Sequence, residues 1–159
     1  MIKHFRYFFR RIDSSRTFIR ILFMKLLMFY SKDWWYKTAS KTLADVPEED
    51  KEESTTDTVV IFFHCEEGDE ARHDSVVQKF VKNTKWLAGK FNVKNVVLHS
   101  FNHLSSSKSS PDFARSLLEE VRQRLENTGY NVMVTPFGYF NEFKLHVAGD
   151  SLAKVFKEF

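Results

Sequence analysis

A chain of 159 residues is long enough for one domain that buries about two-thirds of the surface of its unfolded state. Its hydrophobic fraction of 43%, with 17 phenylalanines, supplies the material for a core and excludes global disorder. The single cysteine, Cys65, excludes an internal disulfide and suits a reducing cytoplasm. The chain is too short for a class II synthetase catalytic domain and has no glycine-rich phosphate-binding loop, so we expect neither aminoacylation nor ATP binding.

The positive charge is concentrated at the N-terminus. Residues 1–23 carry six Lys and Arg against one Asp, a net +5, so the overall charge of +3 leaves −2 for the rest of the chain. This basic, aromatic leader is either non-native or dispensable, an arm that binds RNA phosphates, or a segment that lies on a membrane surface, and we favour the first interpretation. Arg20 and Lys25 interrupt the apolar run from Phe18 to Tyr30, so this run is too short and too charged to span a bilayer, and we expect no membrane partner.

The first elements after the leader are aromatic and then acidic. The apolar run from Lys25 to Ser31 predicts a buried strand. The adjacent Trp34, Trp35 and Tyr36 fit either core packing or stacking on a nucleobase. We favour the core, because strand alternation places the first and third of these rings on one face. The acidic segment from Val46 to Asp57 predicts a solvated loop that would repel RNA.

The middle of the chain alternates between buried strands and amphipathic helices. Five consecutive apolar residues predict a central strand that is buried on both faces. Helical spacing predicts one helix with Asp74 as its N-cap and a second with Ser110 as the cap, Pro111 in the first turn and Gly129 as the stop. The expected elements are, in chain order, a strand over Thr58–Glu66, a helix over Asp74–Lys90, a strand over Lys94–His99, a helix from Pro111 and a strand over Tyr130–Thr135.

A turn near the C-terminus opens directly into a strand. Pro136 restricts the backbone before the turn, Gly138 permits a conformation that other residues avoid, and alternation begins at Tyr139. Gly149 ends that strand, and the apolar residues after Asp150 predict a short terminal helix. Strands interleaved with two helices predict an α/β fold in which a mixed sheet carries helices on one face.

Two stretches combine a strand boundary with polar residues and are the candidates for a functional site. In one, a strand ends and the loop Ser100–Ser106 begins; the other is the turn and strand Pro136–Lys144. Pockets of open α/β sheets form where strand ends meet such loops, so we expect the site between these stretches. On composition alone, the second stretch also fits a hairpin corner whose aromatic residues belong to the core.

The segments KLLMFYSKDWW, VVLHSFNHLSS and NVMVTPFGYFNEFK together resemble the archaeal threonyl-tRNA synthetase N-terminal editing domain. The similarity runs from Met24 to the end of the chain, so we take residues 24–159 as the domain. It implies a D-aminoacyl-tRNA deacylase-like fold, with a second strand over Trp34–Thr42 beside the first. It also implies hydrolysis of serine that has been wrongly attached to threonine tRNA.

The resemblance also assigns functional residues. It implies that His103 and Asn141 lie beside the ester, as the catalytic residues. The residues that it implies for the substrate pocket are Cys65, Ser100, Phe101, Asn102, Phe137, Tyr139 and Phe140.

This chain departs from the family at three positions. Asn141 occupies the place of a lysine, Phe140 that of a common tyrosine, and Lys154 that of an acidic residue. Asn141 can donate a hydrogen bond but cannot supply positive charge near a developing oxyanion, which costs on the order of 10²-fold in rate by analogy with the removal of one such donor. Lys144 is a poor replacement because alternation directs it to the opposite face.

Two other chemistries receive little support. Cys65 follows His64, but adjacent strand residues point to opposite faces, so the pair cannot act directly as nucleophile and base, and we expect Cys65 to pack. His99 and His103 lie in a strand and a loop without a third ligand nearby, so we expect no metal. Without the resemblance, His103 is also consistent with an exposed loop residue.

Three functions therefore remain open. The first is a freestanding, cytoplasmic deacylase that clears Ser-tRNA(Thr) in trans without a cofactor. The second is a catalytically weak relative that binds the aminoacyl-tRNA end or a synthetase, and the third is an unrelated α/β interaction domain. Expected partners are the aminoacylated end of tRNA(Thr), a separate threonyl-tRNA synthetase and a second copy of the chain.

Overall fold

The longest strand, β1 (Lys25–Lys41), organises the sheet in this computed structural model, which describes residues 23–159. β1 pairs antiparallel with β2 (Glu52–His64) along most of its length. On its other edge, the first part of β1 pairs with β6 (Lys154–Glu158) and the second part with β5 (Tyr139–Val147). One strand therefore has three neighbours.

Parallel strands complete the other side of the sheet. β3 (Asn95–Ser100) pairs with β2, and β4 (Asn131–Val134) pairs with β3, which gives the order β4-β3-β2-β1-β5. Helix α1 (His73–Lys90) connects β2 to β3 and helix α2 (Pro111–Glu126) connects β3 to β4. Because β2, β3 and β4 are parallel, their C-terminal ends and the loops that follow meet at one edge of the sheet.

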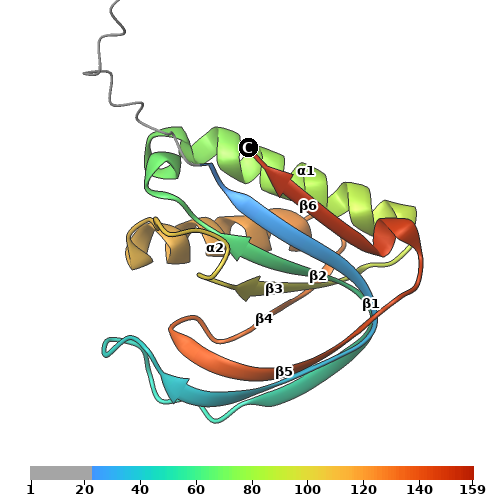
Figure 1. The fold of residues 1–159 in the computed structure, drawn as a ribbon, viewed down its shortest axis with the longest axis horizontal. Helices are drawn as coiled ribbons and strands as arrows, with labels where there is room; N and C mark the ends of the chain where they lie inside the picture. The colour runs from blue at the N-terminus through green and yellow to red at the C-terminus, as the bar shows by residue number, and fades with distance from the viewer. Residues whose placement is uncertain (1–22) are drawn as a thin grey trace, which may run out of the picture.

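Both helices lie on the same face of the sheet (Figure 1). Apolar residues of β1, β2 and β3 on this face pack with the buried stripes of α1 and α2 in the larger core. The smaller core lies on the opposite face, around Trp34, Tyr36, Val60, Phe62 and Val97. The expected α/β class, the helices on one face and the core position of Trp34 and Tyr36 are confirmed.

The sheet curls until β5 faces the central strands across the smaller core. The ring centroid of Phe143 on β5 lies 5.4 Å from those of Trp34, Phe62 and His99, the last of which belongs to β3. β5 and β3 are separated by two strands in the hydrogen-bonded order, so only a strong curl brings these rings together. The outer halves of β1 and β2 follow β5 around this curl (Figure 1).

The prediction of two separate strands over Lys25–Ser31 and Trp34–Thr42 is wrong, because both are halves of β1. The pairing with β5 shifts register between Ser31 and Asp33, and Asp57 opposite has a φ of 45°. Ser31 Oγ lies 2.7 Å from Asp33 O and 3.0 Å from His146 O. A bulge therefore bends the strand where the sequence suggested a turn.

Two further predictions need correction. The segment after Asp150 forms a short 3₁₀ turn (Ser151–Ala153) and then β6, because the free edge of β1 offers backbone partners that a terminal helix would leave unused. The acidic loop is shorter than predicted, since β2 already begins at Glu52. Glu52 and the next residue, Glu53, accept hydrogen bonds from Trp35 and Tyr36 at 2.9 and 2.8 Å.

The remaining elements lie close to the predicted ranges. Ser110 caps α2 by accepting a hydrogen bond from the Phe113 N–H, as predicted, whereas Asp74 lies inside the first turn of α1 after a short 3₁₀ helix (Glu67–Arg72). The predicted leader falls outside the described residues except for Phe23. Within residues 23–159, neither helix combines the length and the apolar character needed to cross a bilayer.

Candidate functional site

A cavity of about 500 Å³ lies at the C-terminal edge of the parallel strands. It is lined by residues that follow β2 and β3, by the first turn of α2, and by the turn and strand from Pro136 to Phe143. This is the location expected for ligand pockets of open α/β sheets. The structure brings all nine candidate residues to the lining of this one cavity: Cys65, Ser100, Phe101, Asn102, His103, Phe137, Tyr139, Phe140 and Asn141.

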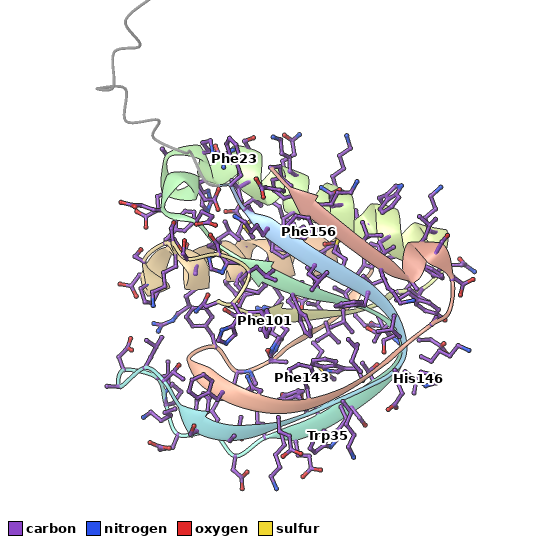
Figure 2. All side chains as sticks on the ribbon, in the orientation of Figure 1. Phe23, Trp35, Phe101, Phe143, His146 and Phe156 are labelled. Atoms are coloured by element: carbon purple, nitrogen blue, oxygen red, sulfur yellow. The ribbon has the colours of Figure 1, made fainter. Side chains whose placement is uncertain are left out.

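The cavity extends around the strand ends to both faces of the sheet. On the helix side, Cys65 and Phe137 approach α2, where Ala114 also lines the wall. On the concave side, Phe101 and Phe143 lie in the space between the central strands and β5, whereas Trp35 points outward (Figure 2). The two sides give the pocket a mainly apolar wall with polar groups at the strand ends, as is usual for small-molecule sites.

The loop between β3 and α2, which carries His103, is fixed to the end of β2 at several points. The N–H groups of Phe101 and Ser109 donate to Phe63 O and Cys65 O, both at 2.9 Å. Between these anchors, Ser107 Oγ donates to Glu66 Oε2 at 2.6 Å. Backbone and side-chain contacts thus hold a loop that has no regular secondary structure of its own.

A buried charge network supports this anchoring. Lys25 Nζ lies 2.5 Å from Glu66 Oε1, and the two side chains are 9% and 0% exposed. Burial alone would raise the pKa of Glu66, but hydrogen bonds from Lys25, Ser105 and Ser107 together hold it below its ordinary value. Glu66 is therefore a carboxylate that joins the start of β1 to the pocket loop.

The turn before β5 depends on Gly138. Its φ is 81°, and a Cβ added there would lie 2.9 Å from Val46 Cγ1. The Gly138 carbonyl accepts from the Thr42 N–H at 2.7 Å, so the turn is held against the segment after β1. Tyr139 Oη adds two bonds to the same segment, donating to Pro47 O and accepting from the Glu49 N–H, each at 2.8 Å.

Asn141 lines the pocket with an amide whose donors are already engaged. Its Nδ2 lies 3.4 Å from both Pro136 O and Tyr139 O. Its Oδ1 is buried and has no hydrogen-bond partner among residues 23–159. Donation to a substrate would therefore require the amide to leave these two carbonyls, a constraint that the sequence alone did not reveal.

Two buried titratable groups of the wall, Cys65 and His99, are shifted toward their neutral forms. Burial raises the pKa of the Cys65 thiol, which makes a thiolate nucleophile unfavourable. Burial lowers the pKa of His99 to about 4, so its ring is neutral at physiological pH. Among the described residues that line the cavity, none is acidic and Lys108 is the one with a formal positive charge, so the pocket favours an anionic or neutral ligand.

Several lining residues were not proposed from the sequence. The sequence suggests His99 only as a metal ligand. Lys108 and Thr42 lie outside both candidate stretches, and Phe143 lies in one of them without a predicted role. The parallel arrangement of β2 and β3 would have identified the residues after both strands, but only the curl of the sheet brings Phe143 to the site. Within residues 23–159, no three His, Cys, Asp or Glu side chains gather to hold a metal ion.

The comparisons with known proteins point to one family. The family model for the Archaea-specific editing domain of threonyl-tRNA synthetase matches residues 24–159. The chain is 35% identical over 135 residues to the threonine–tRNA ligase of Thermococcus onnurineus, covering 83% of this chain and 22% of that protein. For the same enzyme from Methanosphaera stadtmanae, the identity is 32% over 134 residues, with 83% and 22% covered. The chain thus spans about a fifth of the length of these relatives.

A likeness to a solved structure concerns the fold alone. The c-Myc DNA unwinding element binding protein superposes with a TM-score of 0.58 at 10% sequence identity, covering 84% of this chain and 97% of that one. The expected α/β fold, a mixed sheet with helices packed on it, is confirmed and is shared with that structure. The family inferred from the sequence motifs is confirmed as well: the chain belongs to the archaeal editing domains of threonyl-tRNA synthetase.

Proposed function

We propose that this domain hydrolyses the ester that links serine to tRNA(Thr), acting in trans on tRNA charged by a separate synthetase. Water attacks the ester carbonyl, the bond to the ribose oxygen breaks, and serine and tRNA with a free terminal hydroxyl are released. The observation that carries the proposal is the convergence of both sequence motifs of the family on one cavity. Its volume of about 500 Å³ lies in the range of small-molecule sites.

We place the reacting ester among the polar residues at the strand ends and its serine side chain against the apolar wall. His103 lies in the anchored loop, exposed at the cavity, where an imidazole can exchange a proton with the reacting group. Asn141 and the backbone groups of the turn lie across the cavity. Phe101, Cys65 and Phe137 give the apolar surface that excludes the additional methyl group of threonine.

The charge of the cavity supports an RNA end as the ligand. Lys108 and the N-terminal turn of α2, at Ser110 and Pro111, both line it, and no acidic residue does so among the described residues. The ammonium group and the helix N-terminus each favour a phosphate-bearing molecule. The tRNA 3′ end brings phosphates, a ribose and the amino acid together to such a surface.

A second function is favoured by the state of Asn141. Its amide donors contact Pro136 O and Tyr139 O, and it brings no positive charge to the pocket. A domain in this state can bind the charged tRNA end without hydrolysing it. The second candidate is therefore a recognition module that holds aminoacyl-tRNA or joins a synthetase.

The test measures the release of labelled serine from Ser-tRNA(Thr) by the full chain and by two variants. We expect His103→Ala to slow release by on the order of 10²-fold, the size of one acid–base contribution. His146→Ala is the matched control, because this histidine is exposed on β5 and does not line the cavity. If the parent and His103→Ala release serine equally fast, the assignment of His103 is wrong. If the parent binds tRNA but releases no serine, the recognition module is favoured.

A further inference from the structure

His99 is a buried histidine of the pocket wall that the proposed reaction does not use. It lies near the end of β3, is 4% exposed and lines the cavity. Its Nδ1 is 2.9 Å from Oγ1 of Thr135, a residue that is itself 2% exposed. Its Nε2 has no hydrogen-bond partner among residues 23–159. One ring nitrogen is thus held by the protein, and the part of the residue that remains accessible opens onto the cavity.

The surroundings of His99 keep the ring in place and uncharged. Four aromatic rings surround it, with centroids 4.9 to 6.0 Å away. They belong to Trp34 of β1, Phe62 of β2, Phe143 of β5 and Phe101 in the loop after β3. Neither these side chains nor Thr135 carries a charge, and burial lowers the pKa of the imidazole to about 4. A neutral imidazole offers one donor and one acceptor, so Nε2 remains available for one hydrogen bond.

We propose that His99 is a substrate-binding residue whose Nε2 makes a hydrogen bond to the aminoacylated nucleoside at the tRNA 3′ end. The inference deepens the proposed function and rests on it. A ligand that fills the cavity displaces the water that would otherwise satisfy Nε2, so the ligand itself must supply the partner. The hydroxyl of Thr135 can engage Nδ1 as donor or as acceptor, so Nε2 offers the ligand the complementary role, an N–H donor or a ring-nitrogen acceptor.

Binding is measured with 3′-deoxy-3′-(L-serylamino)adenosine, an analogue of the serylated tRNA end in which a stable amide replaces the ester. The substitution His99→Phe keeps an aromatic ring in the cluster and removes both nitrogens. We expect calorimetry on the full chain to show binding weakened by about 3- to 10-fold, the effect of one neutral hydrogen bond. In serine release, KM should rise by the same factor with kcat nearly unchanged, because the bond is made equally in the ground and transition states.

Two further measurements guard against a variant that fails to fold. In the parent protein, the ¹⁵N resonance of His99 Nε2 should move when the analogue is added, and equally at pH 6 and pH 8, because the ring stays neutral. Thr135→Val retains the imidazole but removes the hydroxyl beside Nδ1, so it should weaken binding less than His99→Phe does. His146→Phe, an exposed histidine of β5 outside the pocket, is the matched control and should bind like the parent.

The outcomes separate this inference from the proposed function. An unmoved Nε2 resonance, or equal affinity of His99→Phe and the parent, would overturn the role of His99. If the parent still released serine in that case, the proposed deacylase function would be unaffected. A parent that neither binds the analogue nor releases serine would refute the proposed function, and the inference would fall with it.

Discussion

Gly138 shows at the scale of one residue how the pocket depends on the backbone. The turn at Pro136–Tyr139 carries the candidate residues Phe137 and Tyr139 into place, and it can do so only because position 138 has a positive φ and no side chain. A proline followed two residues later by glycine predicted this turn. The contact with Val46 was not predictable, because it joins segments about ninety residues apart in the sequence.

Gly138→Ala should therefore lower the free energy of unfolding by about 1–3 kcal/mol, from the strained φ and the contact of the new methyl group with Val46. Gly149→Ala is the matched control. Its position has open space and no positive φ, so we expect less than about 0.5 kcal/mol. Chemical denaturation of both variants makes the comparison, and equal stability of the two would show that the turn does not require glycine.

Asn141 is the residue at which this chain departs most clearly from the family pattern. We expect Asn141→Lys to raise the rate of serine release by up to about 10²-fold, since an ammonium group at the pocket wall stabilises a developing oxyanion. Glu142→Gln changes the net charge by the same one unit, one residue further along and on the opposite face of β5. Single-turnover kinetics decide between them: a gain confined to position 141 supports the account, and an equal gain at both would indicate a general effect of charge on RNA binding.

At the scale of elements, a buried ion pair joins β1 to the loop before α2 that lines the pocket. β1 starts with Lys25, whose buried partner Glu66 also holds Ser107 of that loop. The periodicity of the sequence located the start of β1, where Lys25 lies, and the end of β2, which Glu66 follows. It contained no signal for an ion pair between these residues, which are 41 positions apart. For the same reason the terminal helix was predicted wrongly, because the pairing of β6 with the free edge of β1 is a tertiary interaction that overrides local spacing.

Glu66→Gln should destabilise the protein by about 3–5 kcal/mol, because it leaves the buried ammonium of Lys25 with only the longer, 3.9 Å contact to the half-exposed carboxylate of Glu158. The double variant Glu66→Gln with Lys25→Met should recover much of the loss, since no buried charge then lacks a partner. Glu67→Gln, at an exposed neighbouring position, is the control and should change stability little. Denaturation midpoints that are equal for Glu66→Gln and Glu67→Gln would show that the network does not stabilise the fold.

At the scale of the whole molecule, the sequence was most informative where motif and topology coincide. The nine candidate residues meet in one cavity because they lie at strand ends, and the order of strands and helices was sufficient to predict that edge. The curl of the sheet was not predictable, since it depends on a bulge near Ser31 that has the composition of a turn. The curl is nevertheless what brings Phe143 of β5 to His99 of β3 and closes the concave side of the pocket.

The central claim is that this domain removes serine from tRNA(Thr), and the most direct test is the single-turnover release of labelled amino acid from Ser-tRNA(Thr) and Thr-tRNA(Thr). The full chain and a protein beginning at Met24 are compared, so that any contribution of the basic leader is seen in the same assay. We predict serine release about 10- to 200-fold faster than threonine release, the discrimination that one methyl group provides in an apolar pocket. Equal rates for the two esters, or no release above buffer while tRNA still binds, would contradict the account.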